Sequence, residues 1–116
     1  MTFHAVMILN FAGLLEGLRR EKLVEAILAC ESEEGGFSER PHVKPPYLEP
    51  TYYSVELLTL LGAGVRWPIS HVHFIVSLQN SNGGFRRSSV AGISDFANTC
   101  RALKTLKRLV KWIRGP

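Results

Sequence analysis

Apolar residues recur at three- and four-residue spacings along most of this chain, a pattern typical of amphipathic α-helices. The segments that keep this spacing predict five helices, at about 3–18, 20–31, 51–62, 69–79 and 95–113. No stretch alternates apolar and polar residues for long enough to predict a β-strand. We therefore expect an all-α protein.

Glycine, proline and capping residues mark where these helices begin and end. Gly62 is placed to terminate the third helix, and Pro68 fits the first turn of the fourth. Ser94 or Asp95 can cap the last helix. The prolines at positions 41, 45, 46 and 50 exclude regular helix from the loop before the third helix.

Two segments of the chain resemble each other, which indicates an internal repeat. Residues 27–37 and 75–85 each end a helix and then read Gly-Gly-Phe, at an offset of 48. The helix starts at 49–57 and 95–103 match at an offset of 46. We expect a single domain over 1–116, with one repeat at about 20–64 and a second at about 68–108. The helix at about 3–18 and the basic helix at about 95–113 are candidate end caps.

Each repeat carries the same short motif around its double glycine. The paired glycines permit the positive φ of a tight reversal, and the phenylalanine can fill the gap between helices. The Glu or Gln at the helix end can accept hydrogen bonds from free N–H groups at the start of a neighbouring helix. The residues assigned to this structural motif are Glu31, Gly35, Gly36, Phe37, Gln79, Gly83, Gly84 and Phe85.

These motifs resemble the repeat of the prenyltransferase β-subunit and terpene cyclase superfamily. Residues 72–85 are similar to its aromatic, Leu/Ile, Gln and Gly-aromatic signature. Residues 49–53, Glu-Pro-Thr-Tyr-Tyr, are similar to the opening of its inner helices. The resemblance implies an α/α toroid built from helical hairpins. The family closes its ring with five or six of them, whereas 116 residues provide about two and a half, which is a partial toroid.

The resemblance also implies where chemistry would occur, and several of the required groups are missing. The family's zinc ligands are an Asp-x-Cys pair and a histidine. This chain has no Asp-x-Cys, and Asn98 occupies the histidine position. Asn is a poor zinc ligand beside imidazole or thiolate. The aspartate-rich motif of the cyclases is absent, since Asp95 is the only aspartate. We therefore assign no catalytic residue, no metal and no cofactor, and do not expect an enzyme in the isolated chain.

Several residues at the predicted helix starts could line an apolar, isoprenoid-like ligand pocket: Tyr52, Tyr53, Phe96 and Asn98. Other candidates have simpler interpretations. His71 and His73 are two residues apart on a helix and point in different directions, so they are a poor metal pair. Cys30 and Cys100 lie in apolar helical stripes, as inert core thiols do.

The charge of the chain is concentrated at one end. The formal net charge is +4, and six bases with no acid lie from Arg101 onward. An amphipathic basic helix is typical of contact with an acidic partner or a membrane surface. Nucleic acid is disfavoured because the charge occupies one element and no recognition motif is present. Two unpaired cysteines, and an N-terminal apolar run without a preceding base, favour a cytoplasmic location.

Three functions remain open at this stage. The first is a truncated toroid protein without zinc-dependent catalysis that binds an apolar ligand or associates with itself. The second is a prenyltransferase-like enzyme completed by a partner toroid subunit. The third is a helical interaction module for an acidic partner or a membrane surface.

Overall fold

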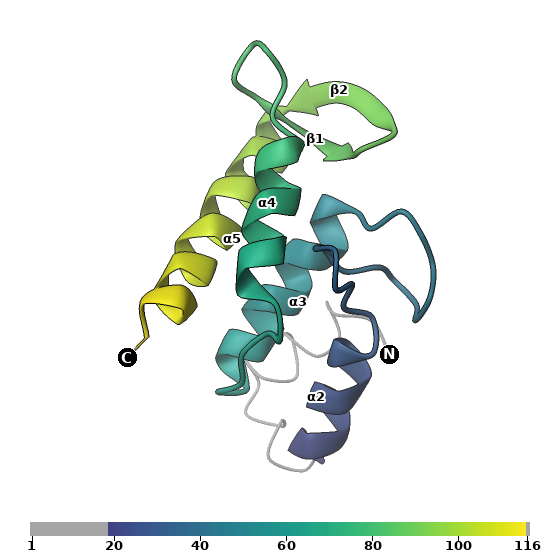
Figure 1. Cartoon of the computed structure of the whole chain (residues 1–116), viewed down its shortest axis with the longest axis vertical. Helices are drawn as coiled ribbons and strands as arrows, with labels where there is room; N and C mark the ends of the chain where they lie inside the picture. The colour runs from purple at the N-terminus through teal and green to yellow at the C-terminus, as the bar shows by residue number, and fades with distance from the viewer. Residues whose placement is uncertain (1–18, 116) are drawn as a thin grey trace.

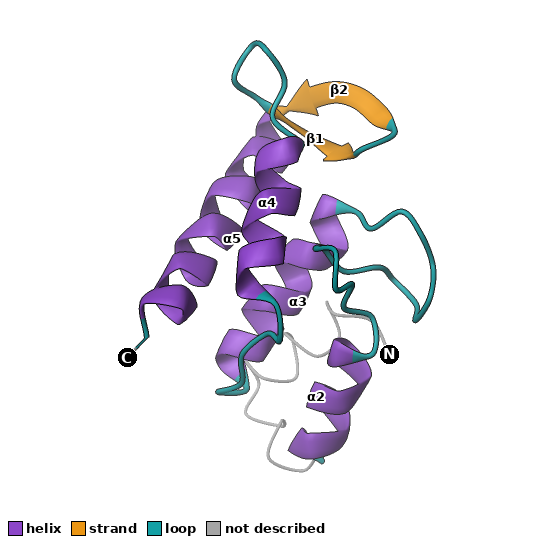
Figure 2. Ribbon diagram, viewed as in Figure 1, coloured by secondary structure: helices purple, strands orange, loops and turns teal. Residues whose placement is uncertain are grey.

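The structure, a computed structural model, describes residues 19–115 and is mostly helical (Figures 1 and 2). In chain order the elements are α2 (Arg20–Leu28), α3 (Leu48–Leu60), α4 (Pro68–Ser77), β1 (Phe85–Ser88), β2 (Ala91–Asp95) and α5 (Phe96–Arg114). The helix predicted at about 3–18 lies outside the described residues. The described part of the chain therefore contains four helices and one pair of strands.

The predicted signals mark most helix boundaries, but α3 begins three residues earlier than predicted, and α2 and α4 end three and two residues earlier. Pro68 begins α4, Gly62 follows the end of α3 with φ of +71°, and the Asp95 side chain accepts a hydrogen bond from the backbone N–H of Asn98. Helix α3 begins at Leu48 rather than near Thr51, because Pro50 lies within its first turn, where a missing N–H costs nothing.

The expectation of an all-α chain is wrong for residues 85–95, where β1 and β2 form an antiparallel pair. Phe85 pairs with Asp95, and the register shifts between Arg86 and Ser88. The pairing escaped the sequence analysis because strands of four and five residues are too short to show a period of two. In the first unit Phe37 and Tyr47 form the equivalent single bridge, and the three prolines between them limit further pairing.

The core lies between α3 and the helices that pack around it. Helix α3 contacts both α2 and α5, and α5 also contacts α4 (Figure 1). One cluster of buried apolar side chains joins these helices to the two Gly-Gly-Phe turns: Ile27, Phe37, Leu48, Val55, Leu57, Leu58, Leu61, Ile75, Leu78, Phe85, Ala102 and Leu109. The phenylalanine of each turn is thus part of the core.

The two units make the same hydrogen bonds at positions 48 residues apart. The N–H of Phe37 donates to Oγ1 of Thr51, and the N–H of Phe85 donates to Oγ1 of Thr99. Each threonine hydroxyl in turn donates to a carbonyl four residues earlier, that of Tyr47 or Asp95. The offset of 46 at the helix starts is therefore wrong: Asp95 occupies the place of Tyr47 and not that of Glu49.

Candidate functional site

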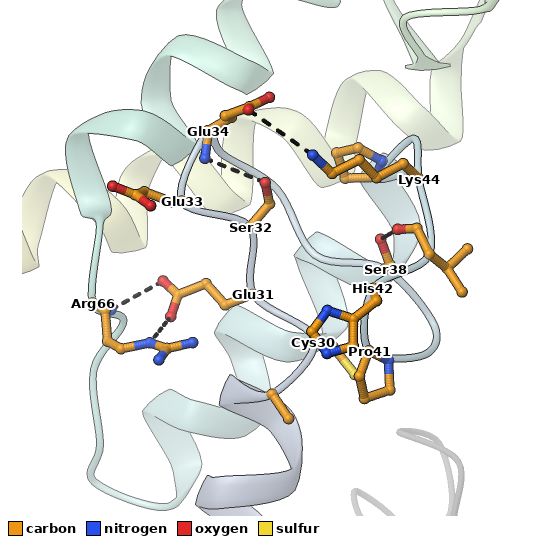
Figure 3. A pocket seen from close by; sticks show the side chains of 13 residues that line it. Cys30, Glu31, Ser32, Glu33, Glu34, Ser38, Pro41, His42, Lys44 and Arg66 are labelled. Carbon is orange, nitrogen blue, oxygen red and sulfur yellow. Dashed lines mark hydrogen bonds and ion pairs between the residues drawn. The ribbon is translucent and has the colours of Figure 1, made fainter.

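Glu31 is the centre of a buried polar cluster that joins the Gly35-Gly36 turn to the start of α4. Its Oε2 atom accepts from the backbone N–H groups of Arg66 and Trp67 at 3.0 and 3.2 Å. Its Oε1 atom accepts from Nε of Arg66 at 2.9 Å (Figure 3). The first turn of a helix has unsatisfied N–H groups and a partial positive charge, so a carboxylate here is stabilised. These are bonds of the kind that the sequence predicted for Glu31, to N–H groups at the start of a neighbouring helix.

His71 completes the cluster from the first turn of α4. Its side chain is fully buried, and its Nε2 atom lies 2.7 Å from Oε2 of Glu31. Its Nδ1 atom lies 2.7 Å from the backbone N of Gly36 and accepts a hydrogen bond from that N–H. Nδ1 therefore carries no proton, and Nε2 donates to the carboxylate. The imidazole also stacks on Phe37, with ring centroids 5.0 Å apart.

The cluster favours the ionised form of Glu31. Burial alone would raise the pKa of its carboxyl group. The hydrogen bonds from His71, Arg66 and the backbone N–H of Trp67 outweigh burial and lower the pKa below the ordinary value of 4.5. At neutral pH the carboxylate is therefore charged, and its hydrogen bonds join the Gly35-Gly36 turn to the start of α4.

The sequence analysis missed two members of this cluster, His71 and Arg66. In the sequence His71 forms only a poor metal pair with His73, and no neighbouring residue indicates that its side chain is buried. The available signal was the difference between the repeats. An acid at Glu31, where the second unit has Gln79, indicates a cationic or donor-rich partner that the second unit lacks.

Gln79 has a different environment from Glu31, although the two residues occupy equivalent positions. It is exposed, and its Nε2 atom donates to the carbonyl of Gly83 within its own turn. No helix start of the described chain packs on it as α4 packs on Glu31. The second unit therefore carries the motif without the contact that the motif makes in the first unit.

Helix α5 shows the same contrast along its length. Leu48 and Val55 of α3 are 0% exposed, whereas Phe96 and Leu103, 48 residues later, are 84% and 57% exposed. Val110 continues this row at the same spacing of seven residues and is also exposed. We call the row formed by Phe96, Leu103 and Val110 the open edge. In Figure 1 no described element lies beyond α5 on the side away from α4.

The structure brings only part of the predicted ligand site together. Asn98 is buried; its Nδ2 donates to Oδ2 of Asp95 at 3.2 Å, and its Oδ1 accepts from Arg101 at 3.3 Å. Tyr52 and Tyr53 are partly buried, with ring centroids 5.1 Å apart. Phe96 belongs to the open edge. A pocket formed by these four residues stays a prediction.

A hollow of about 900 Å³ lies elsewhere, between the end of α2 and the loop at 38–46 (Figure 3). Its walls include Cys30, Glu34 and Lys44, of which Glu34 and Lys44 form an exposed ion pair at 3.9 Å. Burial raises the pKa of the Cys30 thiol, so this sulfur stays protonated and is not an activated nucleophile. Among residues 19–115 no three His, Cys, Asp or Glu groups come together as metal ligands.

Comparison with known proteins identifies the class to which this fold belongs. The prenyltransferase α/α-toroid domain model matches residues 1–114. The chain therefore belongs to the prenyltransferase α/α-toroid domain family, as its motifs suggested. A search of curated proteins finds no match. Within the described residues, no helix has the length and apolar character needed to cross a membrane.

Proposed function

We propose that this chain is a non-catalytic member of the toroid family whose function is to bind a helical partner chain along the open edge. The observation that carries the proposal is the difference between equivalent positions. The face of α3 that holds Leu48 and Val55 is buried in the core, to which α5 also contributes side chains. The matching face of α5, which holds Phe96 and Leu103, is exposed. An exposed apolar face of this kind is surface that a further helix can bury.

The chemistry around Asn98 supports binding over zinc-dependent prenyl transfer. Its carboxamide is engaged by Asp95 and Arg101, and amide oxygens are weak zinc ligands. The alternative is an enzyme whose metal ligands come from the partner chain. Zinc-dependent transfer of a prenyl group to a thiol peptide by this chain, alone or with a toroid partner, would contradict the non-catalytic proposal.

Light scattering after gel filtration tests the binding function. At about 0.1 M sodium chloride the charged side chains repel over about 10 Å, and at about 1 M over only about 3 Å. We expect the chain to self-associate at high salt, where its apolar edge is the dominant attraction, and the variant Leu103→Ser to stay monomeric. Association at high salt that Leu103→Ser leaves unchanged would overturn the proposal.

A second candidate function is the binding of an apolar, isoprenoid-like ligand near Tyr52, Tyr53, Phe96 and Asn98. The exposed ring of Phe96 at the start of α5 favours it, because an exposed aromatic side chain can cover an isoprenoid chain. Calorimetric titration with farnesyl diphosphate tests this function. Binding that Phe96→Ser removes would support it, and no heat of binding would exclude it.

A further inference from the structure

We infer that the open edge binds a helix with an acidic face, supplied by a partner chain that is not a second copy of this one. The inference rests on the proposed function and adds the chemistry of the partner. It follows from a comparison of two sets of charges: those along the contact between α3 and α5, and those at the equivalent positions beside the open edge.

The contact between α3 and α5 pairs acids on α3 with bases on α5. Arg101 lies 3.4 Å from a carboxylate oxygen of Glu49, and Nε of Arg108 donates to Glu56 at 3.1 Å. Both the acids and the bases are seven residues apart, which keeps each pair on one side of its helix. The contact between α3 and α5 is therefore one example of how a helix of one repeat is covered by the equivalent helix of the next repeat.

The side of α5 that carries the open edge has a base where α3 has an acid. Lys104 is 48 residues after Glu56, so it stands where the covered helix α3 carries its acid. A helix that covers α5 as α5 covers α3 needs an acid in the place that Arg108 fills. A second copy of α5 would bring Arg108 against Lys104, and like charges in a contact cost binding energy.

Further bases extend this preference along the helix. Four basic side chains of α5 make no ion pair with any described residue: Lys104, Lys107, Lys111 and Arg114. At 100° per residue the lysines lie beside the row of Phe96, Leu103 and Val110. An apolar row with a spacing of seven, flanked by one sign of charge, is typical of a surface that pairs with a helix of opposite charge.

A helical partner fits these observations better than a membrane surface does. The equivalent face of α3 is covered by a helix, and the equivalent residue to Gln79 receives the start of a helix. The bases of α5 also lie on one side of its apolar row and not on both. An anionic membrane remains an outcome that the experiment can detect.

The test uses a charge-reversed form of the chain as an acidic helix of the right shape. In the variant Lys104→Glu/Lys107→Glu/Lys111→Glu, α5 keeps its apolar row and presents acids beside it. We expect the wild-type chain to bind this variant at least about tenfold more tightly than it binds itself near 0.1 M salt. The difference should fall as salt is raised.

A matched control separates the local effect from the change in net charge. The variant Lys22→Glu/Arg40→Glu/Arg87→Glu has the same net charge, but its substitutions are exposed and lie outside α5. Equal binding of both variants to wild type would overturn the inference. So would binding of wild type to vesicles with one third phosphatidylserine combined with no preference for the reversed chain. If the triple variant loses its helical circular dichroism, the single variant Lys104→Glu gives the same comparison with a smaller gain.

The two proposals fail in different ways. Self-association that is as strong at low salt as at high salt would contradict the acidic partner but leave the binding edge intact. A chain that stays monomeric at high salt and also ignores the reversed variant would contradict both proposals.

Discussion

At the scale of single residues, the carboxylate of Glu31 is a buried charge that holds two segments of the chain together. Glu31 accepts hydrogen bonds from two backbone N–H groups, a guanidinium and an imidazole. Each donor would lose its partner if the carboxylate were removed, and an unsatisfied buried donor is costly. These hydrogen bonds hold the start of α4 against the Gly35-Gly36 turn.

The substitution Glu31→Gln should therefore destabilise the fold. We expect a loss of about 3 kcal/mol in the free energy of unfolding, since one partner of a buried ionic cluster is removed. Urea denaturation measures it. The matched control is Glu33→Gln in the same turn, where the exposed side chain should change stability by less than about 0.5 kcal/mol. Equal losses for both variants would contradict the role given to Glu31.

The same carboxylate predicts a dependence of stability on pH. Its pKa in the folded state lies below the ordinary value of 4.5, so the folded state binds the proton less readily than the unfolded state. Its stabilisation is complete above about pH 4.5 and is lost as the pH falls through the folded pKa. Denaturation curves between pH 7 and 3 should show this loss in wild type, and Glu31→Gln should flatten that part of the profile. Parallel profiles for the two proteins would contradict the assignment.

At the scale of elements, the two Gly-Gly turns share their backbone hydrogen bonds but have different surroundings. Both glycines of the first turn have a positive φ, whereas in the second turn only Gly83 does. A Cβ atom on Gly35 would lie 2.2 Å from the Ser70 carbonyl oxygen and 2.8 Å from Cβ of Phe74, whereas a Cβ on Gly83 would meet nothing within 4 Å. Helix α4 covers the first turn, and no described helix covers the second. The two turns are therefore alike in sequence, but they differ in how closely a helix packs against them.

This difference predicts unequal effects of alanine. Gly83→Ala should cost only about 1–2 kcal/mol, the strain of a left-handed conformation with φ of +92°. Gly35→Ala should cost clearly more or prevent folding, because it also pushes α4 away from the turn. Thermal unfolding followed by circular dichroism compares the two. A larger loss for Gly83→Ala would contradict the observed packing.

At the scale of the whole molecule, the two units are similar in pattern but not in burial. Leu103 and Val55 occupy equivalent positions, and only Val55 is enclosed. We expect Val55→Ala to lower the free energy of unfolding by about 2 kcal/mol through lost apolar contact and a cavity. Leu103→Ala should change it by less than about 0.5 kcal/mol. It should still weaken association at high salt, which separates folding from binding.

The sequence alone predicted the four described helices, the family and the place of the Gly-Gly-Phe turns. These depend on local periodicity, on glycine and proline, and on short motifs, all of which can be seen along the chain. It also indicated that Glu31 would accept from a helix start. It aligned the two repeats two residues out of register at these helix starts, because Asp95 resembles Glu49 in chemistry although its backbone occupies the place of Tyr47.

Only the tertiary structure decided which of the two similar units is covered. Whether Leu48 or Phe96 is buried, and whether Glu31 or Gln79 meets a helix start, depends on contacts between residues far apart in the chain. The same holds for the burial of His71, which lies 40 residues from its partner Glu31. Burial is a property of neighbours in space, so two segments with nearly the same pattern can become a core and an exposed binding edge.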